Sequence, residues 1–478
     1  AARGDVPLRH VAYLTDVVRL RAGREQLFGT KFRELDGELV PHPIEKEAEV
    51  DARRQRAGLE PLAAYARRLR RTFSPRRTKA RMTDGIDWAS FARHHWEKAP
   101  GVLSPEAPIV PGERVFRTLV EASAPFRFGT RFRALPNVKF LTGNAQLRAP
   151  GTLLPGPGDD DVGSYLRRVA DKVGGRRSQL LVEQPFLLDF FLWDRLRGFL
   201  QGLFERVGLP VLPVSTEVFV GDFARAPRGV EARPHHSLFL LVLQGRLRIR
   251  VSTSPATVLE AREGQVLYVP SRAEYVEECR GRCMALRLWI PMAGAPPVEE
   301  VRELLVTLLD EQMSPEGPVP LLPYPWRRGR QGTGAPIASL SRVARGLEAL
   351  IQGPDLEQAL RILWAQRVSA GGLEPVPPPL DVPPLEDATL VRGVPHVRVV
   401  RMEDSPGQWI WAIHGHAFPM QESPESSQIL DVLRSGEAVR VSELCRVARR
   451  ASQRAMIRQL LETLHALRAL EVVAGRED

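Results

Sequence analysis

The chain is poor in cysteine and aromatic residues and contains no long apolar run. Its 478 residues include three cysteines (Cys279, Cys283 and Cys445), and 7% of the residues are aromatic. So few cysteines argue against a disulfide-rich secreted scaffold and predict a reducing compartment. No apolar stretch approaches the 18 or so residues that a membrane-spanning helix needs. We therefore expect a cytoplasmic protein with no membrane partner.

What is present is enough apolar sequence for several folded cores, together with an excess of basic residues. Hydrophobic residues make up 43% of the chain, and the length predicts two to four domains. Lysine plus arginine exceeds aspartate plus glutamate by 67 − 57 = 10. This balance favours anionic partners, among them nucleic acid. A GC-rich genome that encodes arginine in place of lysine would give the same composition.

Shifts in composition divide the chain into segments of a mixed α+β protein. Proline-rich and arginine-rich stretches mark linkers, and the hydrophobic period changes between the segments. The expected units are a partial α+β domain (1–65), a basic linker (66–82), a main domain (83–292), a helical region (293–375), a proline-rich linker (376–388) and a C-terminal domain with three helices and a terminal hairpin, similar to a winged helix (389–478).

The N-terminal unit carries short motifs that include Gln26-Leu27-Phe28-Gly29-Thr30 and Gly58-Leu59. With these motifs, residues 1–81 resemble the C-terminal part of an uncharacterised bacterial family, which implies no activity. His10 and Gln26 are candidates for a polar site, with surface or capping roles as the alternative. The junction near residue 82 also reads as a fusion of two proteins.

A second resemblance rests on motifs that flank the main domain. Residues 91–100 read Phe-x-x-x-x-Trp-x-Lys-x-Pro, Trp193-Asp194-Arg195-Leu196 lies in an amphipathic helix, and Gly208-Leu209-Pro210 follows it. This pattern resembles bacterial JmjC-type, cupin-fold proteins, whose relatives include ribosomal oxygenases that use iron(II) and 2-oxoglutarate. The resemblance implies a double-stranded β-helix over about 215–290 with flanking helices.

The residues at the metal positions of that family are different in this chain. The family carries His-x-Asp on one strand and a second His on a facing strand, which together leave open positions on iron for 2-oxoglutarate and oxygen. Here Glu231 and Arg233 stand at the first pair and Tyr275 at the second His. Leu247 stands where a cation binds the co-substrate carboxylate. The resemblance therefore implies a barrel without its iron and 2-oxoglutarate ligands.

Two alternatives keep a site in the barrel. His235 and His236 are candidates for a shifted metal site, but the spacing to Gly245 is short and the distal histidine is still absent. Glu231, Arg233, His235 and Tyr275 are candidates for a metal-free pocket that binds an anion or another polar ligand.

Other chemistry-bearing residues receive structural interpretations. We expect Cys279 and Cys283 to be buried unpaired thiols, with half a zinc site as the alternative. Three aspartates at 159–161 read as helix-start charges. His414 and His416 read as exposed strand residues, with metal ligation as the alternative.

These patterns predict a binding or scaffold protein of JmjC/cupin type that has no cofactor and binds a protein or peptide partner. The alternative is an active oxygenase with non-standard ligation, which would use iron(II) and 2-oxoglutarate. A weaker alternative is a regulator that binds nucleic acid through the C-terminal domain. The helical region over 293–375 has an apolar stripe that fits a homodimer or packing on the barrel.

Overall fold

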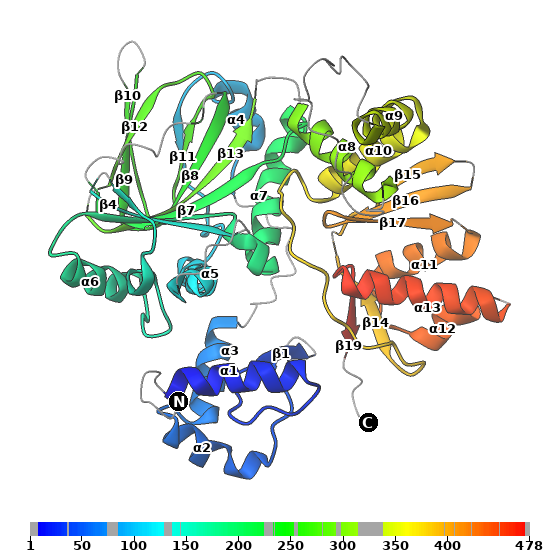
Figure 1. The fold of residues 1–478 in the computed structure, drawn as a ribbon, viewed down its shortest axis with the longest axis horizontal. Coiled ribbons are helices and arrows are strands. Elements are labelled where there is room, and N and C mark those ends of the chain that lie inside the picture. Colours follow the sequence, from blue (N-terminus) through cyan, green and yellow to red (C-terminus); the bar gives the residue numbers. More distant parts are fainter. Residues whose placement is uncertain are drawn as a thin grey trace, which may run out of the picture.

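The computed structural model is a mixed helix and sheet protein with one large antiparallel sheet, as the sequence predicts (Figure 1). No helix among the described residues is long and apolar enough to cross a membrane. The residues that the structure describes are 8–35, 38–73, 85–128, 136–143, 145–223, 233, 235–252, 257–279, 281–292, 298–313, 338–395, 397–405, 407–421, 423–448 and 450–473.

The N-terminal unit is a small α+β structure. It consists of α1 (Leu8–Arg21), β1 (Phe32–Leu35), β2 (Glu38–Pro41), α2 (Val50–Arg56) and α3 (Leu62–Phe73). The buried Asp16 carboxylate accepts hydrogen bonds from the backbone N–H groups of Leu27, Phe28 and Thr30, which fixes the loop after α1. Because α3 continues to Phe73, the linker predicted to begin at residue 66 is helical in its first part. The rest of that linker lies outside the described residues.

Two antiparallel sheets form the main domain. The larger sheet has the order β3 (Gly101–Leu103), β11 (Val266–Val269), β8 (His236–Gln244), β13 (Cys283–Pro291), β7 (Ser215–Gly221), β6 (Ser178–Glu183), β4 (Asn137–Thr142) and β5 (Ala145–Leu147). The smaller sheet has the order β10 (Thr257–Arg262), β9 (Arg246–Val251) and β12 (Tyr275–Cys279). Between β8 and β13 the chain crosses from one sheet to the other several times, and interior side chains of both sheets pack in one core, so the two sheets enclose a common interior.

The central strands of the larger sheet are buried on both faces, and this explains their continuous apolar runs. On β7, Phe219 faces the smaller sheet, whereas Val218 and Val220 face the opposite side. That opposite side is covered by α4 (Trp88–His94), α5 (Gly112–Ser123), α6 (Val162–Lys172) and α7 (Phe190–Val207). Because successive side chains of a strand point to opposite faces of the sheet, every second residue lies in the barrel interior and the others lie in the outer core beneath the helices.

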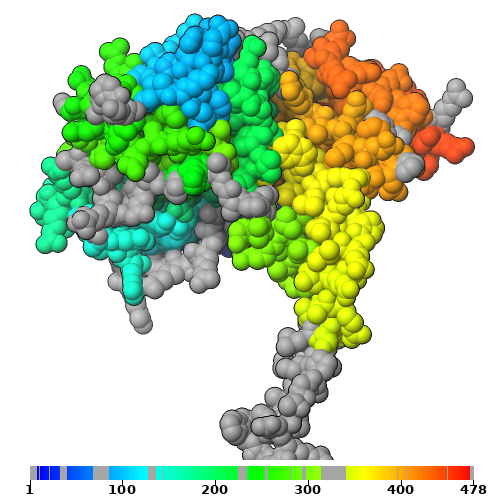
Figure 2. Space-filling view, turned by 90° about the horizontal axis from the view of Figure 1, so that it is seen from above, coloured from blue at the N-terminus to red at the C-terminus, as the bar shows by residue number. Residues whose placement is uncertain are grey.

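Three helices follow the barrel: α8 (Val298–Gln312), α9 (Ala338–Gln352) and α10 (Pro354–Ser369). Figure 2 shows this group at the outer surface of the molecule, beside the barrel. Arg367 on α10 is buried and pairs with Glu300 on α8 at 2.6 Å and with Glu374 at 2.9 Å. These ion pairs attach α8 to α10, although α8 itself has no fully buried residue.

The C-terminal region contains two small sheets and three helices. One sheet is β15 (Val400–Ser405), β16 (Gln408–Ile413) and β17 (His416–Gln421), and α10 packs on it. The other has the order β18 (Val439–Arg440), β14 (Leu390–Gly393) and β19 (Leu470–Val473). It lies with α11 (Pro424–Ser435), α12 (Val441–Arg446) and α13 (Ala451–Ala466) around one core.

The prediction of a winged helix with a terminal hairpin differs from this arrangement. The three predicted helices are present, but the last strand, β19, pairs with β14 from before the helices. Among the described residues no later strand follows β19, so the hairpin that would form the wing is replaced by an upstream strand.

Candidate functional site

The barrel interior is apolar at one end and polar at the other. Leu247, Val242 and Ala285 are buried at the apolar end. At the other end, β7 and β12 begin with Ser215 and Tyr275, and Trp289 lies near the end of β13. We call the set Ser215, Arg233, Tyr275 and Trp289 the polar end of the barrel.

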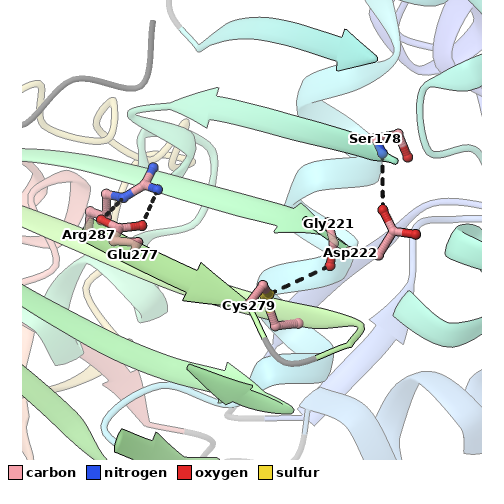
Figure 3. The surroundings of a disulfide bond; sticks show 7 residues. Ser178, Gly221, Asp222, Glu277, Cys279 and Arg287 are labelled. Carbon is pink, nitrogen blue, oxygen red and sulfur yellow. Dashed lines mark hydrogen bonds and ion pairs between the residues drawn. A yellow bond between two sulfur atoms is a disulfide. The ribbon is translucent and has the colours of Figure 1, made fainter. Parts of the chain in front are cut away.

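The largest charged group inside the barrel is an arginine held between two glutamates. Arg287 on β13 is fully buried, and its Nε and Nη2 atoms donate to the two carboxylate oxygens of Glu277 on β12, at 3.0 and 2.6 Å (Figure 3). Its Nη1 atom donates to Glu217 on β7. We call these three residues the arginine triad. It joins the two sheets through charge-assisted hydrogen bonds, of which the pair with Glu277 is bidentate.

The arginine of the triad keeps its charge. Burial by itself lowers the pKa of the Arg287 guanidinium, but the carboxylates of Glu277 and Glu217 raise it, and the net shift is upward. The guanidinium also stands over the ring of Phe219, with its central carbon 4.2 Å from the ring centroid. The interior of the barrel is therefore already occupied by a cation that belongs to the protein.

Tyr275 lies two residues before Glu277 on β12, and both side chains face the interior. Burial raises the pKa of the Tyr275 phenol, the nearby carboxylates of Glu277 and Glu217 raise it further, and the arginines oppose the shift. The side chain is therefore a neutral phenol at neutral pH.

The other predicted site residues differ in their contacts and surroundings. Arg233 donates from Nη1 to the Ser215 hydroxyl at 2.7 Å, and its guanidinium stands over the Trp289 ring at 5.4 Å. Leu247 is buried in the apolar part of the interior and brings no charge to it. Glu231 lies outside the described residues.

Of the two adjacent histidines, His236 lies beside the polar end of the barrel and His235 does not. His235 is exposed and has a φ of 62°, and its carbonyl accepts from the Met292 N–H at 2.9 Å. His236 begins β8, with its ring edge-on to Trp289 at 6.5 Å between centroids. The two side chains therefore differ in surroundings, as expected for successive residues at a loop-to-strand junction.

We tested whether iron(II) fits this donor set. Iron enzymes of the related type require two imidazoles and one carboxylate on one face of the metal. Here the described positions supply a guanidinium, a neutral phenol and an aliphatic side chain. In the part of the chain that the structure describes, no three His, Cys, Asp or Glu side chains gather so as to hold a metal ion. These residues do not fit an iron centre.

Comparisons with known proteins give a family match for the N-terminal unit. A family model described as a family of unknown function (DUF6624) matches residues 4–76. This agrees with the predicted resemblance of that unit to an uncharacterised family. No curated protein matches the chain.

Solved structures resemble the chain at low identity. The ribosomal oxygenase YcfD from Escherichia coli is 15% identical, with 81% of this chain and 98% of that chain covered and a TM-score of 0.40. Another structure of E. coli YcfD is 16% identical, with the same coverage and a TM-score of 0.42. A cupin superfamily protein from Desulfitobacterium hafniense DCB-2 is 20% identical, with 16% and 68% covered and a TM-score of 0.15.

The cysteines near the barrel differ from the prediction. Cys279 at the end of β12 and Cys283 at the start of β13 form a disulfide across the turn between these strands, close to Gly221 of β7 (Figure 3). The expectation of two unpaired thiols came from the low cysteine count of the whole chain. That count carries no information about which two side chains a hairpin brings together.

The arginine triad was not predicted from the sequence. Its members are Glu217 within an apolar strand, Arg287 within another, and Glu277 in an acidic pair. The usable signal is a charged residue at an inward position of a strand that is otherwise apolar, because such a residue needs a partner of opposite charge.

A second polar network fastens the segment after α4 to the barrel. Glu97 has a φ of 53°, which is unusual for a residue with a side chain. Its carboxylate accepts from the Tyr268 hydroxyl at 3.1 Å, from the Ser271 N–H at 3.2 Å, and from the hydroxyls of Ser237 and Ser271. This network lies on the helix-covered side of the larger sheet.

Replacing Glu97 by Gln is expected to lower the free energy of unfolding by about 1–2 kcal/mol, because one acceptor oxygen becomes a donor that faces hydroxyl groups. Urea unfolding measures the change. Glu106→Gln, at an exposed position on the same side, serves as the control and should change stability little. Equal effects of the two substitutions would show that the network does not stabilise the protein.

His414 is buried where the barrel meets the C-terminal region, contrary to the expected exposed position. Its Nδ1 atom donates to the Leu467 carbonyl at 2.9 Å, and its ring lies edge-on to Phe190 and Trp193 of α7. His416 instead has Nε2 2.9 Å from the Pro377 carbonyl. Both histidines therefore have backbone partners, and their role in the structure is to join segments.

Asp161 lies at the start of α6, as predicted, whereas Asp159 has a different structural role. Asp161 caps α6 by accepting from the Ser164 N–H at 2.6 Å, and Asp159 pairs with Arg168 at 2.6 Å.

Proposed function

We propose that this chain is a binding or scaffold protein, built on a barrel of JmjC/cupin type that does not use iron or 2-oxoglutarate. The observation that carries the proposal is the arginine triad. A guanidinium held by two carboxylates occupies the interior, and a dication placed beside it would meet the repulsion of a buried like charge.

The residues at the family's ligand positions support the same conclusion. Arg233 stands where a carboxylate would bind the metal, Tyr275 is a neutral phenol, and Leu247 has no charge for a co-substrate carboxylate. The sequence motifs that frame the barrel and the two antiparallel sheets that share one interior support the choice of barrel type. The partner that we propose is a protein or peptide, since the barrel and its surrounding helices remain while the oxygen chemistry lacks its ligands.

The experiment that tests this proposal is a turnover assay. The protein is reconstituted anaerobically with iron(II), supplied with 2-oxoglutarate and air, and assayed for succinate. We expect no succinate above that formed by iron(II) alone. Succinate release that depends on the protein and disappears with a chelator would favour an oxygenase with non-standard ligation.

We further propose that α8–α10 form the contact between two copies of the chain. Helix α8 has no fully buried residue, although apolar side chains repeat along it. A short amphipathic helix gains most of its stability from burial of its apolar face. Large apolar side chains exposed on the three helices are Val298, Val306, Val343, Ile351, Leu360 and Trp364.

The expected result is a dimer in size-exclusion chromatography with light scattering. Val306→Glu together with Ile351→Glu should shift the protein to the monomer, because charges on this face oppose its burial. Val258→Glu, at an exposed position on β10, is the matched control and should leave the dimer intact. A wild-type protein that remains monomeric at high concentration would contradict this proposal.

A further inference from the structure

The polar end of the barrel has a buried donor that lacks an acceptor. The Trp289 side chain faces the interior and is 3% exposed, and its Nε1–H group has no hydrogen-bond partner among the described residues. A buried hydrogen-bond donor without an acceptor lowers the stability of the folded state, so its presence in a folded protein requires an explanation.

A cation without a carboxylate partner lies over the same ring. Arg233 stands above Trp289 and uses Nη1 to donate to Ser215, but it forms no ion pair with any described carboxylate. Arg233 also lies within electrostatic range of Tyr275, whose phenol it influences. The Tyr275 hydroxyl has no hydrogen bond to a described residue either.

The acceptors nearby are already engaged. Glu217 and Glu277 accept from Arg287. Glu183, on the neighbouring strand, accepts from Asn137 at 2.9 Å and from Lys139 at 2.5 Å. Among the described residues, the unused hydrogen-bonding capacity at the polar end is therefore donor capacity, and Arg233 acts on Glu183 through its charge without forming an ion pair with it.

We propose that the polar end of the barrel binds a carboxylate group. Arg233 supplies the charge, and the Trp289 N–H together with the Ser215 and Tyr275 hydroxyls supplies further donors, which is the pattern that recognises an anionic acceptor. The inference rests on the proposed function, because it assigns a ligand to a barrel that works without a metal. The carboxylate belongs either to a small dicarboxylic acid or to an acidic peptide.

Calorimetric titration of the full chain in excess EDTA tests this inference. The probes are glutarate and an acetylated, amidated Asp-Glu-Asp-Glu peptide, which separate the two sources of the carboxylate. We expect saturable binding of at least one probe. Arg233→Met should weaken it by about tenfold or more, as loss of a charge-assisted contact predicts.

Two further variants separate ligand contacts from general effects. Trp289→Phe keeps an aromatic ring beneath Arg233 but removes the N–H donor, and it should weaken binding severalfold. Arg262→Met removes an exposed arginine from β10 on the smaller sheet, and it should leave the affinity unchanged. All three variants should keep the thermal unfolding transition of a folded protein, since neither arginine is buried and Trp289→Phe keeps an aromatic ring at the buried position.

The outcomes distinguish this inference from the function on which it rests. Absence of binding by both probes, or binding that Arg233→Met leaves intact, overturns the carboxylate site and leaves the metal-free barrel standing. Binding of 2-oxoglutarate that requires iron(II), with no binding of glutarate in EDTA, overturns both.

Discussion

Replacing Arg287 by Met is expected to lower the free energy of unfolding by about 3–5 kcal/mol, because it leaves two buried carboxylates without their cation. Glu217 and Glu277 are each less than one-tenth exposed, so water cannot replace the lost hydrogen bonds without opening the barrel. Chemical denaturation at neutral pH measures the change. The matched control is Arg250→Met, since Arg250 pairs with Glu278 at 2.8 Å on the exposed face of the smaller sheet.

The control should cost less than about 1 kcal/mol, as exposed ion pairs do. A triple variant, Glu217→Leu with Glu277→Leu and Arg287→Met, should recover most of the stability, because the cost lies in the unpaired charges and an apolar replacement removes them. If Arg287→Met and Arg250→Met cost the same, or if the triple variant is the least stable, the arginine triad does not have the buried character assigned to it.

Acidification is expected to destabilise the protein through His414. Burial lowers the pKa of this histidine from 6.5 to about 4, and the positive charge of Arg197 contributes to the same shift. Between pH 4 and pH 6.5 the histidine at position 414 binds a proton in the unfolded chain but not in the folded chain. Stability is therefore present above pH 6.5 and falls as the pH decreases to about 4, by about 3 kcal/mol in total.

His414→Asn should flatten this pH dependence. Asparagine tolerates the backbone at position 414, where φ is 49°, and its amide can donate to the Leu467 carbonyl in place of the imidazole. Urea unfolding at pH 7 and at pH 4.5 compares the two proteins. His465, whose pKa burial also lowers, is unchanged in both proteins and leaves a residual slope. An equal loss of stability in the variant and the wild type would remove His414 from this account.

The sequence predicted those parts of the fold that depend on local patterns. The amphipathic helix that ends at Gly208 and the three C-terminal helices follow from hydrophobic period and capping. The assignment of Arg233, Leu247 and Tyr275 to the ligand positions stays a prediction, because it rests on the resemblance to the JmjC-type family.

What the sequence missed depends on contacts between distant strands. Arg287 meets Glu217 across a separation of 70 residues, and only the register of β13 on β7 brings them opposite each other. His414 is buried because α7 covers it, and β19 pairs with β14 rather than with a later strand. The residues that flank these positions in the sequence do not predict such contacts.

The central claim is that a guanidinium belonging to the protein takes the interior that a metal would need. Its most direct test is the iron content of the purified chain after anaerobic dialysis against iron(II) and then against metal-free buffer. The account predicts far less than one equivalent of iron per chain, with no change in stability when a chelator is added. One equivalent retained by the wild type and released by the chelator would contradict it.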